Sequence, residues 1–464
     1  MYKIDFNRPI HIHFIGIGGI SMSGLADVLL DRGFTVSGSD MKASELTEHL
    51  SGRGAEIAYP QSADNIRPGT DLVVYTAAIH PDNPEFAAAA AAGIPMLNRA
   101  DLLGQMMQNY ETSVAVAGTH GKTTTTSMLS HILMKAEMDP TISVGGILPS
   151  IGGNIRVGQS DVFLTEACEY TNSFLSLHPK IGIILNIDAD HLDFFKDLND
   201  IRRSFRRFAE QIPSDGTLVI NADTPAYKTI IDGLACRTVT YGLDVSEADY
   251  TARDIVYDAA GCASFTCYFR GTPAGLFTLR VPGRHNVSNA LAAIAAAFVT
   301  GVPSEAAAAG LESFTGTDRR FQFKGQFGGI DVIDDYAHHP TEIRATLATA
   351  AAGSHKTTWC VFQPHTYTRT KALMDEFADA LAMADRVVLA DIYAARETDD
   401  LGISSDTLRA EIEKRGTEAW YFPSFEEIEV FLLENCREGD LILTVGAGDV
   451  YRIGEELLSK TTEK

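Results

Sequence analysis

A glycine-rich stretch in the first half of the chain has the residue types that bind nucleotide phosphates. In order, its residues are Gly118, Thr119, His120, Gly121, Lys122, Thr123 and Thr124. The amides of such a loop can face the phosphates, and the helix that follows adds the positive end of its dipole. Lys122 would reach the β- and γ-phosphates, and the hydroxyl of Thr123 would bind Mg²⁺. Val116 stands where the commoner loop has its first glycine, so this loop is a shorter type. The structural alternative is a chance glycine turn that caps a helix.

Acidic residues and a histidine follow the next expected strands. Glu166 ends one strand, and Asp188, Asp190 and His191 come just after another. Because the carboxyl ends of parallel strands meet at one edge of a sheet, we expect these side chains near the phosphate loop. Carboxylates suit Mg²⁺, whereas a histidine ligand would indicate a second metal. Each residue alone is more typical of a cap or the surface, but together they favour metal binding.

A second glycine-rich turn lies near the N-terminus. Gly16, Gly18 and Gly19 follow an expected strand, and Ser21 stands where a dinucleotide fingerprint has its third glycine. Asp40 ends the next strand, where an acid would bind a ribose. These features predict a pyrophosphate site, and the spacing leaves open which nucleotide it binds.

Polar side chains also gather in the last two fifths of the chain. Asn286 and Asn289 lie three positions apart at an expected helix start, where their amides could frame a purine or cap the helix. Further polar groups follow two successive strands, and such loops build sites in parallel sheets. These groups are Asp335, Tyr336 and His338, and then His365 and Arg369. One arginine of the pair Arg319 and Arg320 could reach a γ-phosphate, although a solvated pair is more usual.

The elements that hold these residues are expected to form three α/β segments in a row. Strands, glycine turns and helices alternate through residues 1–108, 109–316 and 317–464. This alternation is typical of parallel sheets covered by helices. It predicts a Rossmann-like N-terminal domain, a central domain with a phosphate loop, and a Rossmann-like C-terminal domain.

Composition and charge narrow the class of function. The 464 residues include 38 Lys and Arg against 61 Asp and Glu, for a formal net charge of −23. This balance argues against nucleic acid as the main partner, because phosphate backbones require basic groups. We find no signal-peptide pattern, no apolar run long enough for a membrane span, and no metal-binding spacing among the six cysteines. A cytoplasmic enzyme is therefore expected.

In their order and spacing, these motifs resemble those of the Mur ligases. The resemblance covers nearly the whole chain and rests on the segments 118–123, 190–193, 283–289 and 335–338 together with Glu166. It implies an ATP- and Mg²⁺-dependent ligase that joins L-alanine to the lactyl carboxylate of UDP-N-acetylmuramate through an acyl phosphate. That reaction is a step of peptidoglycan synthesis, and the enzyme would act as a monomer or homodimer.

The resemblance also implies a role for each matching residue. Besides the phosphate loop, the residues expected at ATP are His285, Asn286, Asn289 and Asp335. Those expected at the metal are Thr123, Glu166 and His191. Those expected at the UDP moiety are Gly16, Gly18, Gly19, Ser23 and Asp40. Those expected at the amino acid are Tyr336, His338, His365 and Arg369, and the catalytic set is Lys122, Arg320 and His338, the last as a general base by residue type only.

One departure and several alternatives stay open. Thr366 stands where some family members carry arginine, so the amino-acid carboxylate would depend on Arg369. Alternatively, Arg369 pairs with an acid such as Asp375 and only holds a helix start. A recycling ligase that adds a whole tripeptide to the same nucleotide sugar would share these motifs. An NAD-dependent oxidoreductase would use the turn at 16–19, and a sensor of UDP-sugars would use ATP only as an effector.

Overall fold

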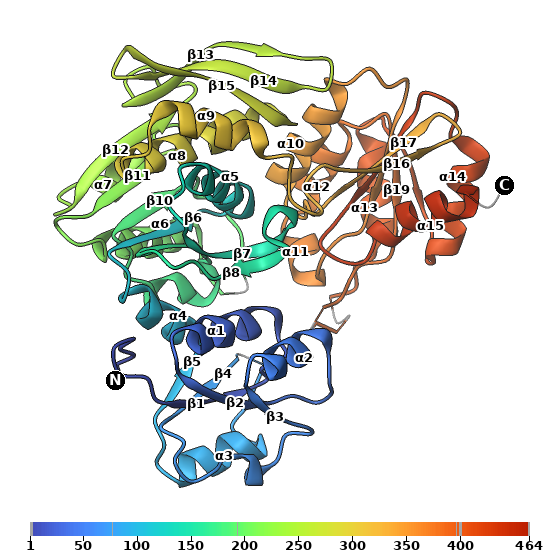
Figure 1. The fold of residues 1–464 in the computed structure, drawn as a ribbon. Helices are drawn as coiled ribbons and strands as arrows, with labels where there is room; N and C mark the ends of the chain where they lie inside the picture. Colours follow the sequence, from blue (N-terminus) through green and yellow to red (C-terminus); the bar gives the residue numbers. More distant parts are fainter. Residues whose placement is uncertain (1–2, 77, 193, 396, 399–400, 463–464) are drawn as a thin grey trace. The chain divides into compact units, whose positions relative to one another are not determined.

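The structure is a computed structural model that describes residues 3–76, 78–192, 194–395, 397–398 and 401–462. The chain forms two compact units, which Figure 1 allows the reader to follow by colour along the sequence. Unit 1 comprises Met1–Ile187, Asn199–Tyr250 and Ala292–Gly310. Unit 2 comprises Asp188–Leu198, Thr251–Leu291 and Leu311–Lys464. Among the described helices, none combines the length and the apolar character that crossing a bilayer requires.

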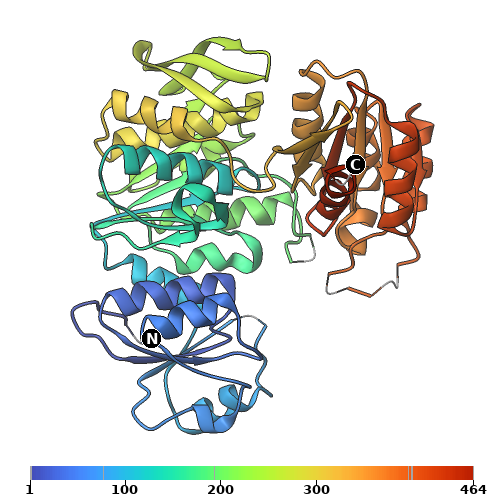
Figure 2. The ribbon, with the colours of Figure 1, turned by 45° about the vertical axis from the view of Figure 1, so that its right-hand side comes forward.

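The first sheet of unit 1 is parallel, with strand order β3-β2-β1-β4-β5. Its strands are β1 (His11–Ile15), β2 (Thr35–Ser39), β3 (Glu56–Ala58), β4 (Leu72–Tyr75) and β5 (Met96–Asn98). Helices α1 (Ile20–Asp31) and α2 (Glu45–Gly52) cover one face and α3 (Pro84–Ala91) covers the other, as Figure 2 shows; α4 (Arg99–Met107) follows β5. Strand β1 pairs with both β2 and β4, so the strand order reverses beside it. Ligands of doubly wound sheets bind at such a reversal.

Seven strands of the second sheet belong to unit 1, in the order β12-β11-β10-β6-β9-β7-β8. They are β6 (Thr112–Ala117), β7 (Thr141–Leu148), β8 (Gly153–Arg156), β9 (Val162–Ala167), β10 (Ile181–Ile184), β11 (Thr217–Asn221) and β12 (Arg237–Gly242). The helices that follow them are α5 (Lys122–Lys135), α6 (Leu198–Glu210) and α7 (Tyr227–Ile231). Helices α8 (Arg284–Val299) and α9 (Ser304–Ser313) come later in the chain, and each has residues in both units. The central strand β6 is buried on both faces, as expected for a parallel sheet between helices.

Unit 2 contains an antiparallel segment and a six-stranded sheet. The antiparallel strands are β13 (Tyr250–Tyr257), β14 (Cys262–Phe269) and β15 (Thr272–Pro282), for which the sequence analysis made no prediction. The six-stranded sheet has the order β16-β17-β21-β18-β19-β20. Its strands are β16 (Gln322–Phe327), β17 (Ile330–Asp335), β18 (Thr358–Phe362), β19 (Arg386–Leu389), β20 (Glu418–Tyr421) and β21 (Leu441–Val445). Only β16 pairs in the antiparallel sense.

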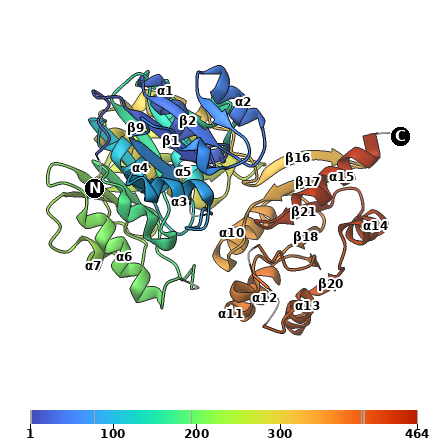
Figure 3. The same cartoon turned by 90° about the horizontal axis from the view of Figure 1, so that it is seen from below.

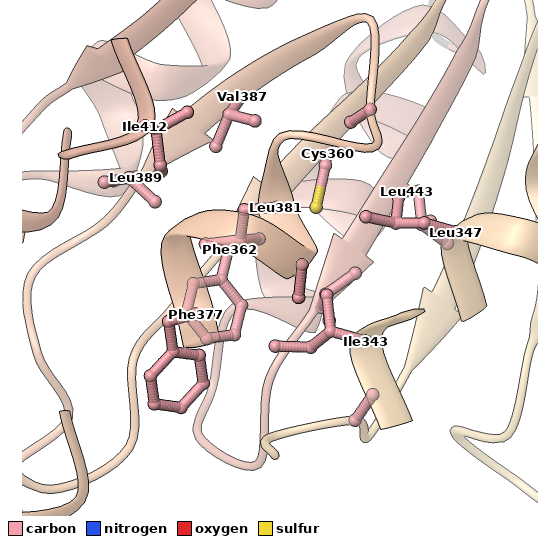
Figure 4. Close-up of a cluster of buried hydrophobic side chains, with 14 of the residues drawn as sticks. Ile343, Leu347, Cys360, Phe362, Phe377, Leu381, Val387, Leu389, Ile412 and Leu443 are labelled. Atoms are coloured by element: carbon pink, nitrogen blue, oxygen red, sulfur yellow. The ribbon is translucent and has the colours of Figure 1, made fainter. Parts of the chain in front are cut away.

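Helices cover both faces of this six-stranded sheet, as Figure 3 shows. They are α10 (Pro340–Ala351), α11 (Tyr367–Ala372), α12 (Met374–Leu381), α13 (Ser405–Lys414), α14 (Phe425–Asn435) and α15 (Tyr451–Thr462). Cys360 and Phe362 pack with α10, α12 and α13 in the core drawn in Figure 4. Trp359 and Val361 pack with α14 and α15. This alternation follows the strand period of two, and truncating Phe362 to Ala would cost about 3–5 kcal/mol.

The sheets confirm the predicted α/β fold class, with helices on parallel-rich sheets. The proposed domain boundaries at 108 and 316 stay predictions, because the compact units divide the chain differently.

Candidate functional site

The predicted phosphate loop connects β6 to α5 in unit 1. Gly121 has a φ of 83°, in the left-handed region that favours glycine. A Cβ at Gly118 would lie 2.8 Å from the Cβ of Leu185, so both glycines are required by the backbone. The amide of His120 donates to Oδ1 of Asn186 at 2.8 Å. The loop is therefore fixed against the residues that follow β10.

Lys122, the first residue of α5, is held by a buried carboxylate. Its Nζ donates to Oε2 of Glu169 at 2.8 Å, to the carbonyl of Thr119 at 3.1 Å, and to the carbonyl of Gly118. Burial alone would lower the pKa of Lys122, but the negative charge of Glu169 raises it above its ordinary value. Lys122 is thus a cation at the start of the helix, where a phosphate would bind. The sequence analysis assigned no role to Glu169, although it lies only three positions after Glu166.

Thr123 and Glu166 both lie against a glycine pair in β7. The amide of Gly145 donates to Oε1 of Glu166 at 2.5 Å, and a Cβ at Gly146 would lie 3.2 Å from Cγ2 of Thr123. A hydroxyl and a carboxylate are oxygen ligands of the kind that Mg²⁺ prefers. The residue types and their shared neighbour therefore fit a magnesium site beside the loop.

The N-terminal glycine turn lines a hollow of about 690 Å³ at the carboxyl end of β1. All three of its predicted glycines and Asp40 belong to the lining. Gly16 has a φ of 82°, and the amide of Gly18 donates to Oδ2 of Asp40 at 2.8 Å. Ser23 is buried in α1, and its hydroxyl donates to the carbonyl of Ile20 at 3.1 Å. The hollow therefore unites four of the five residues predicted for the UDP moiety.

In unit 2, Arg369, His365 and His338 gather beside Asp190. The Nε and Nη2 of Arg369 donate to Oδ1 of Asp190 at 3.2 and 3.0 Å. Nη1 of Arg369 lies 3.3 Å from Nδ1 of His365, and the rings of His365 and His338 have centroids 6.0 Å apart. The ring of Tyr336 lies 5.5 Å from that of His338. All four residues predicted for the amino acid thus lie in one cluster with a buried acid.

Arg369 does pair with an acid, as the structural alternative expected, but that acid is Asp190 and not Asp375. Asp375 pairs instead with Arg415, at 3.1 Å, on the surface of α12. Tyr393 is a member of the cluster that the sequence analysis missed, because its ring stacks on His365 at 5.6 Å. It follows the strand β19, so the rule that site residues follow parallel strands could have found it.

Burial and charge set the protonation of this cluster. Burial by itself raises the pKa of Asp190, but the Arg369 charge and the nearby histidines bring it well below its ordinary value. Burial, with the charges of His338 and Arg369, lowers the pKa of His365 to about 4. Burial also lowers the pKa of His338. At neutral pH the cluster therefore combines an ionised Asp–Arg pair with neutral imidazoles, which can accept a proton.

His191 follows Asp190 in unit 2 and has a φ of 54°. Its amide donates to Oδ1 of Asp190 at 2.7 Å. The same segment is tied to the start of α10, where Thr341 Oγ1 donates to Oδ2 of Asp188 at 2.8 Å. Because Glu166 belongs to unit 1, a metal shared by His191 and Glu166 stays a prediction. Asp193, the last residue of the matching motif, lies outside the described residues.

The two adjacent arginines have different surroundings. Arg319 pairs with buried Asp334 at 3.0 Å and donates to two carbonyls in the segment 446–448. Its guanidinium also lies over the ring of Tyr336 at 4.9 Å. The guanidinium of Arg320 lies over the same ring, 5.2 Å from its centroid. The contacts of Arg319 are thus structural. This is consistent with the prediction that Arg320 is the arginine that reaches a phosphate.

Asp335 lies at the end of β17, next to this arginine pair. It accepts hydrogen bonds from the amides of Phe321 at 2.9 Å and Ala337 at 2.8 Å. Burial raises its pKa to about 6, although the Arg320 charge opposes the shift.

The predicted adenosine residues begin α8. Nδ2 of Asn289 donates to Oδ1 of Asn286 at 3.1 Å, and Nδ2 of Asn286 donates to the carbonyl of Pro282 at 2.7 Å. Burial lowers the pKa of the neighbouring His285 to about 4. The structure therefore places all three residues together at the helix start, with the two amides linked in series.

Comparison with known proteins defines the class. Three family models match the chain: "Mur ligase family, catalytic domain" at residues 11–111, "Mur ligase middle domain" at 116–297, and "Mur ligase, glutamate ligase domain" at 319–448. The chain belongs to the Mur ligase family.

Within this family, the chain is similar over its full length to ligases of one name. The UDP-N-acetylmuramate–L-alanine ligases of Agathobacter rectalis and Lachnospira eligens are each 61% identical to it, over 99% of this chain and 100% of theirs. Among solved structures, the UDP-N-acetylmuramate–alanine ligase of Thermotoga maritima is 32% identical, with a TM-score of 0.78 over 98% of this chain and 99% of that one. A murein peptide ligase from Psychrobacter arcticus is 26% identical, with a TM-score of 0.69 over the same shares.

Proposed function

We propose that the chain joins L-alanine to the lactyl carboxylate of UDP-N-acetylmuramate and cleaves ATP to ADP and phosphate in doing so. The observation that carries this proposal is the full-length likeness, at 61% identity, to two ligases of that name. Two sites support this proposal. The phosphate loop with charged Lys122 suits a nucleoside triphosphate, and the hollow beside Asp40 suits a nucleoside diphosphate. A reaction that consumes ATP and a nucleotide sugar fits the cytoplasm.

The proposed reaction has two steps. A carboxylate oxygen of the lactyl group attacks the γ-phosphorus of ATP, the bond to the β-phosphate oxygen breaks, and ADP leaves. The amine of alanine then attacks the acyl carbon, the bond to the phosphate oxygen breaks, and inorganic phosphate leaves. Two anions approach each other in the first step, so cations must offset their repulsion. Lys122 supplies one such charge, and Arg320 is proposed to supply another.

A bound Mg²⁺ would neutralise the phosphate oxygens and orient the γ-phosphate. We propose Thr123 and Glu166 as its ligands, because both side chains lie against the glycine pair Gly145–Gly146 in β7. His191 is proposed as a further ligand, since it follows β10 in the family motif. Lys122 would hold the β- and γ-phosphates.

We further propose that three successive segments of the chain bind the three substrates. Residues 1–108 would bind the UDP-sugar, 109–316 would bind ATP, and 317–464 would bind alanine. Support for the last assignment comes from Arg369, whose guanidinium suits a carboxylate, and from neutral His338, which could take the amine proton.

The rival within the family is the ligase that adds a murein tripeptide. The alanine ligase of Thermotoga maritima has the higher identity and TM-score of the two solved neighbours, which favours alanine. Steady-state rates with ATP and UDP-N-acetylmuramate, and either free alanine or the tripeptide, separate the two. We expect ADP release and a product heavier by one alanyl residue with alanine only. Efficient use of the tripeptide alone would overturn the proposal. ADP release that requires both co-substrates would also exclude a sensor or an oxidoreductase.

A further inference from the structure

A fully buried carboxylate lies behind the hollow of the first sheet, and the proposed reaction does not use it. Glu85 stands in the first turn of α3 with an exposed fraction of 0%. Its Oε2 accepts a hydrogen bond from the hydroxyl of Ser39 at 2.5 Å and lies 3.3 Å from Nε2 of His13. Its Oε1 accepts from Nδ2 of Asn65 at 2.6 Å and from the amide of Ser62 at 3.1 Å. One carboxylate thus joins four segments of the chain.

The partners of this carboxylate stand beside residues that line the hollow. Ser39 directly precedes Asp40, and Ser62 directly follows Gln61. Asn83, two residues before the carboxylate, donates from Nδ2 to Oε1 of Gln61 at 2.8 Å. Asp40, Gln61 and Asn83 all belong to the lining of the hollow. The carboxylate therefore connects three walls of the hollow from behind without lining it.

The carboxylate is held in its charged form. Burial raises the pKa of Glu85, but the hydrogen bonds from His13, Ser39 and Asn65 bring it below its ordinary value. His13 is itself buried, and its Nδ1 lies 2.9 Å from the hydroxyl of Ser37. Removing a charged acceptor would leave several buried donors unsatisfied, which is costly in a medium of low dielectric constant. The walls would then have to move to satisfy these donors elsewhere.

We propose that Glu85 is a positioning residue for the nucleotide-diphosphate site: it sets the spacing of the walls that carry Asp40, Gln61 and Asn83 without touching the ligand. Binding sites lose affinity when their supporting side chains allow displacements of about 0.5–1 Å. The identity of the ligand as a UDP-sugar rests on the proposed function, whereas the role of Glu85 in shaping the hollow rests on its contacts alone.

The test uses Glu85→Gln in the full chain, with UDP and UDP-N-acetylmuramate as separate calorimetric probes. The variant keeps the side-chain shape but replaces one acceptor oxygen by a donor that would face Ser39 or Asn65. We expect the Kd of both probes to rise about tenfold, because a displaced wall weakens every contact of the ligand. The KM values for ATP and alanine and the kcat at saturating UDP-sugar should stay near those of the wild type.

Glu429→Gln is the matched control, because Glu429 is also a buried acid with a charged partner, Lys460, but lies in unit 2. It should lower the Tm and leave the Kd of both probes unchanged. If Glu85→Gln behaves in the same way, Glu85 is structural only and the proposal is wrong.

Asn65→Ala removes a single bond to the same carboxylate and serves if Glu85→Gln fails to fold. Its Kd for UDP should rise two- to threefold, and an unchanged Kd in the folded variant would overturn the proposal. A wild type that binds UDP but does not ligate alanine would instead refute the proposed function and leave the role of Glu85 standing.

Discussion

The two compact units prepare for charged ligands in different ways. In unit 1 both candidate sites begin with a glycine turn after a parallel strand, so backbone amides supply much of the recognition, and Lys122 adds one charge. In unit 2 the candidate residues are side chains in mutual contact, with the pair of Arg369 and Asp190 at the centre. Backbone amides do not titrate, whereas carboxylates and imidazoles do. We therefore expect phosphate binding to depend mainly on unit 1 and the amino-acid specificity to depend on unit 2, where Arg320 is proposed to add a cation for phosphoryl transfer.

The largest effect should come from Lys122, the lysine that follows the phosphate loop of unit 1. Lys122→Ala should lower kcat by on the order of 10²–10³-fold, the range for losing one preorganised donor to a developing charge. The Kd for UDP-N-acetylmuramate, measured by calorimetry, should stay at the wild-type value, because Lys122 does not line the hollow of the first sheet.

The same substitution leaves the carboxylate of Glu169 without its lysine partner, so part of the loss could reflect stability. The double variant Lys122→Ala with Glu169→Gln removes that buried charge as well and should recover Tm but not kcat. Recovery of activity in the double variant would contradict a direct role of the lysine in phosphoryl transfer.

The next effect is on the pH dependence of stability, which should differ between a carboxyl group of unit 2 and one of unit 1. Asp335 in unit 2 has a pKa raised by burial to about 6, so its folded state binds a proton more tightly than the unfolded chain. Stability is then lost as pH rises from about 4 to about 6. Asparagine does not titrate, so Asp335→Asn should gain up to about 3 kcal/mol of unfolding free energy relative to wild type over this interval, at about 1.4 kcal/mol per pKa unit. Denaturant unfolding at several pH values measures the difference.

Glu85→Gln in unit 1 is the opposite control for that experiment. The pKa of Glu85 is lowered, so its contribution is present above its unfolded value and is lost as pH falls. The difference between this variant and the wild type should therefore change in the opposite direction with pH. His365 and His285, whose pKa values are lowered to about 4, make stability rise with pH towards 6.5, but they do so equally in each pair compared. If the difference from wild type changed with pH in the same direction for both variants, the expected contrast between the units would be wrong.

A smaller effect is expected on the affinity for alanine. Arg369→Ala should raise the KM for alanine roughly 30-fold, about 2 kcal/mol, because a desolvated charge partner of the carboxylate is lost. The KM values for ATP and UDP-sugar should change little. Arg415→Ala is the matched control, since Arg415 pairs with surface acids of α12 and should change stability alone. An unchanged alanine KM in Arg369→Ala would show that Arg369 does not bind the alanine carboxylate and that its role is to pair with Asp190.

The same contrast explains which features could be predicted from sequence. The glycine turns and Lys122 stand within a few positions of one another, so their spacing carries the signal, and the α/β alternation follows from strand and helix periods. The contact of Arg369 with Asp190 joins positions 179 apart, and no local pattern encodes it. Arg319 and Arg320 are the same residue type side by side, and the positive φ of Arg319 and its bonds to Asp334 and to two carbonyls in 446–448 distinguish them.

Other features escaped prediction for similar reasons. Glu169 was visible beside Glu166, but its pairing with Lys122 depends on how β9 lies next to β6. The antiparallel strands β13 to β15 have mixed exposure and no residue that performs chemistry, so neither an apolar run nor a motif marked them.

The smallest effect should come from Asp40, an acid that lines the N-terminal hollow. Oδ2 of Asp40 accepts from the amide of Gly18 at 2.8 Å, and Oδ1 accepts from the amide of Met41 at 2.7 Å. Asp40 thus holds the glycine turn as well as lining the hollow. Asp40→Asn retains one acceptor oxygen, which can still receive the Gly18 amide, and loses a charge-assisted bond.

A bond to a charged group contributes about 1.5–3 kcal/mol and a neutral one about 0.5–1.5, so the difference is about 1 kcal/mol. Asp40→Asn should therefore raise the Kd for UDP roughly fivefold, at about 1.4 kcal/mol per tenfold. Gly18→Ala provides the contrasting control, because the added Cβ would lie 2.8 Å from Oδ2 of Asp40 and 3.0 Å from Cγ2 of Thr47, so the packing of the turn against both side chains must change. If backbone geometry dominates the unit 1 sites, Gly18→Ala must weaken UDP binding more than Asp40→Asn does. The reverse order, in calorimetric titrations of two folded variants, would show that this site depends on side-chain charge, as we expect for unit 2.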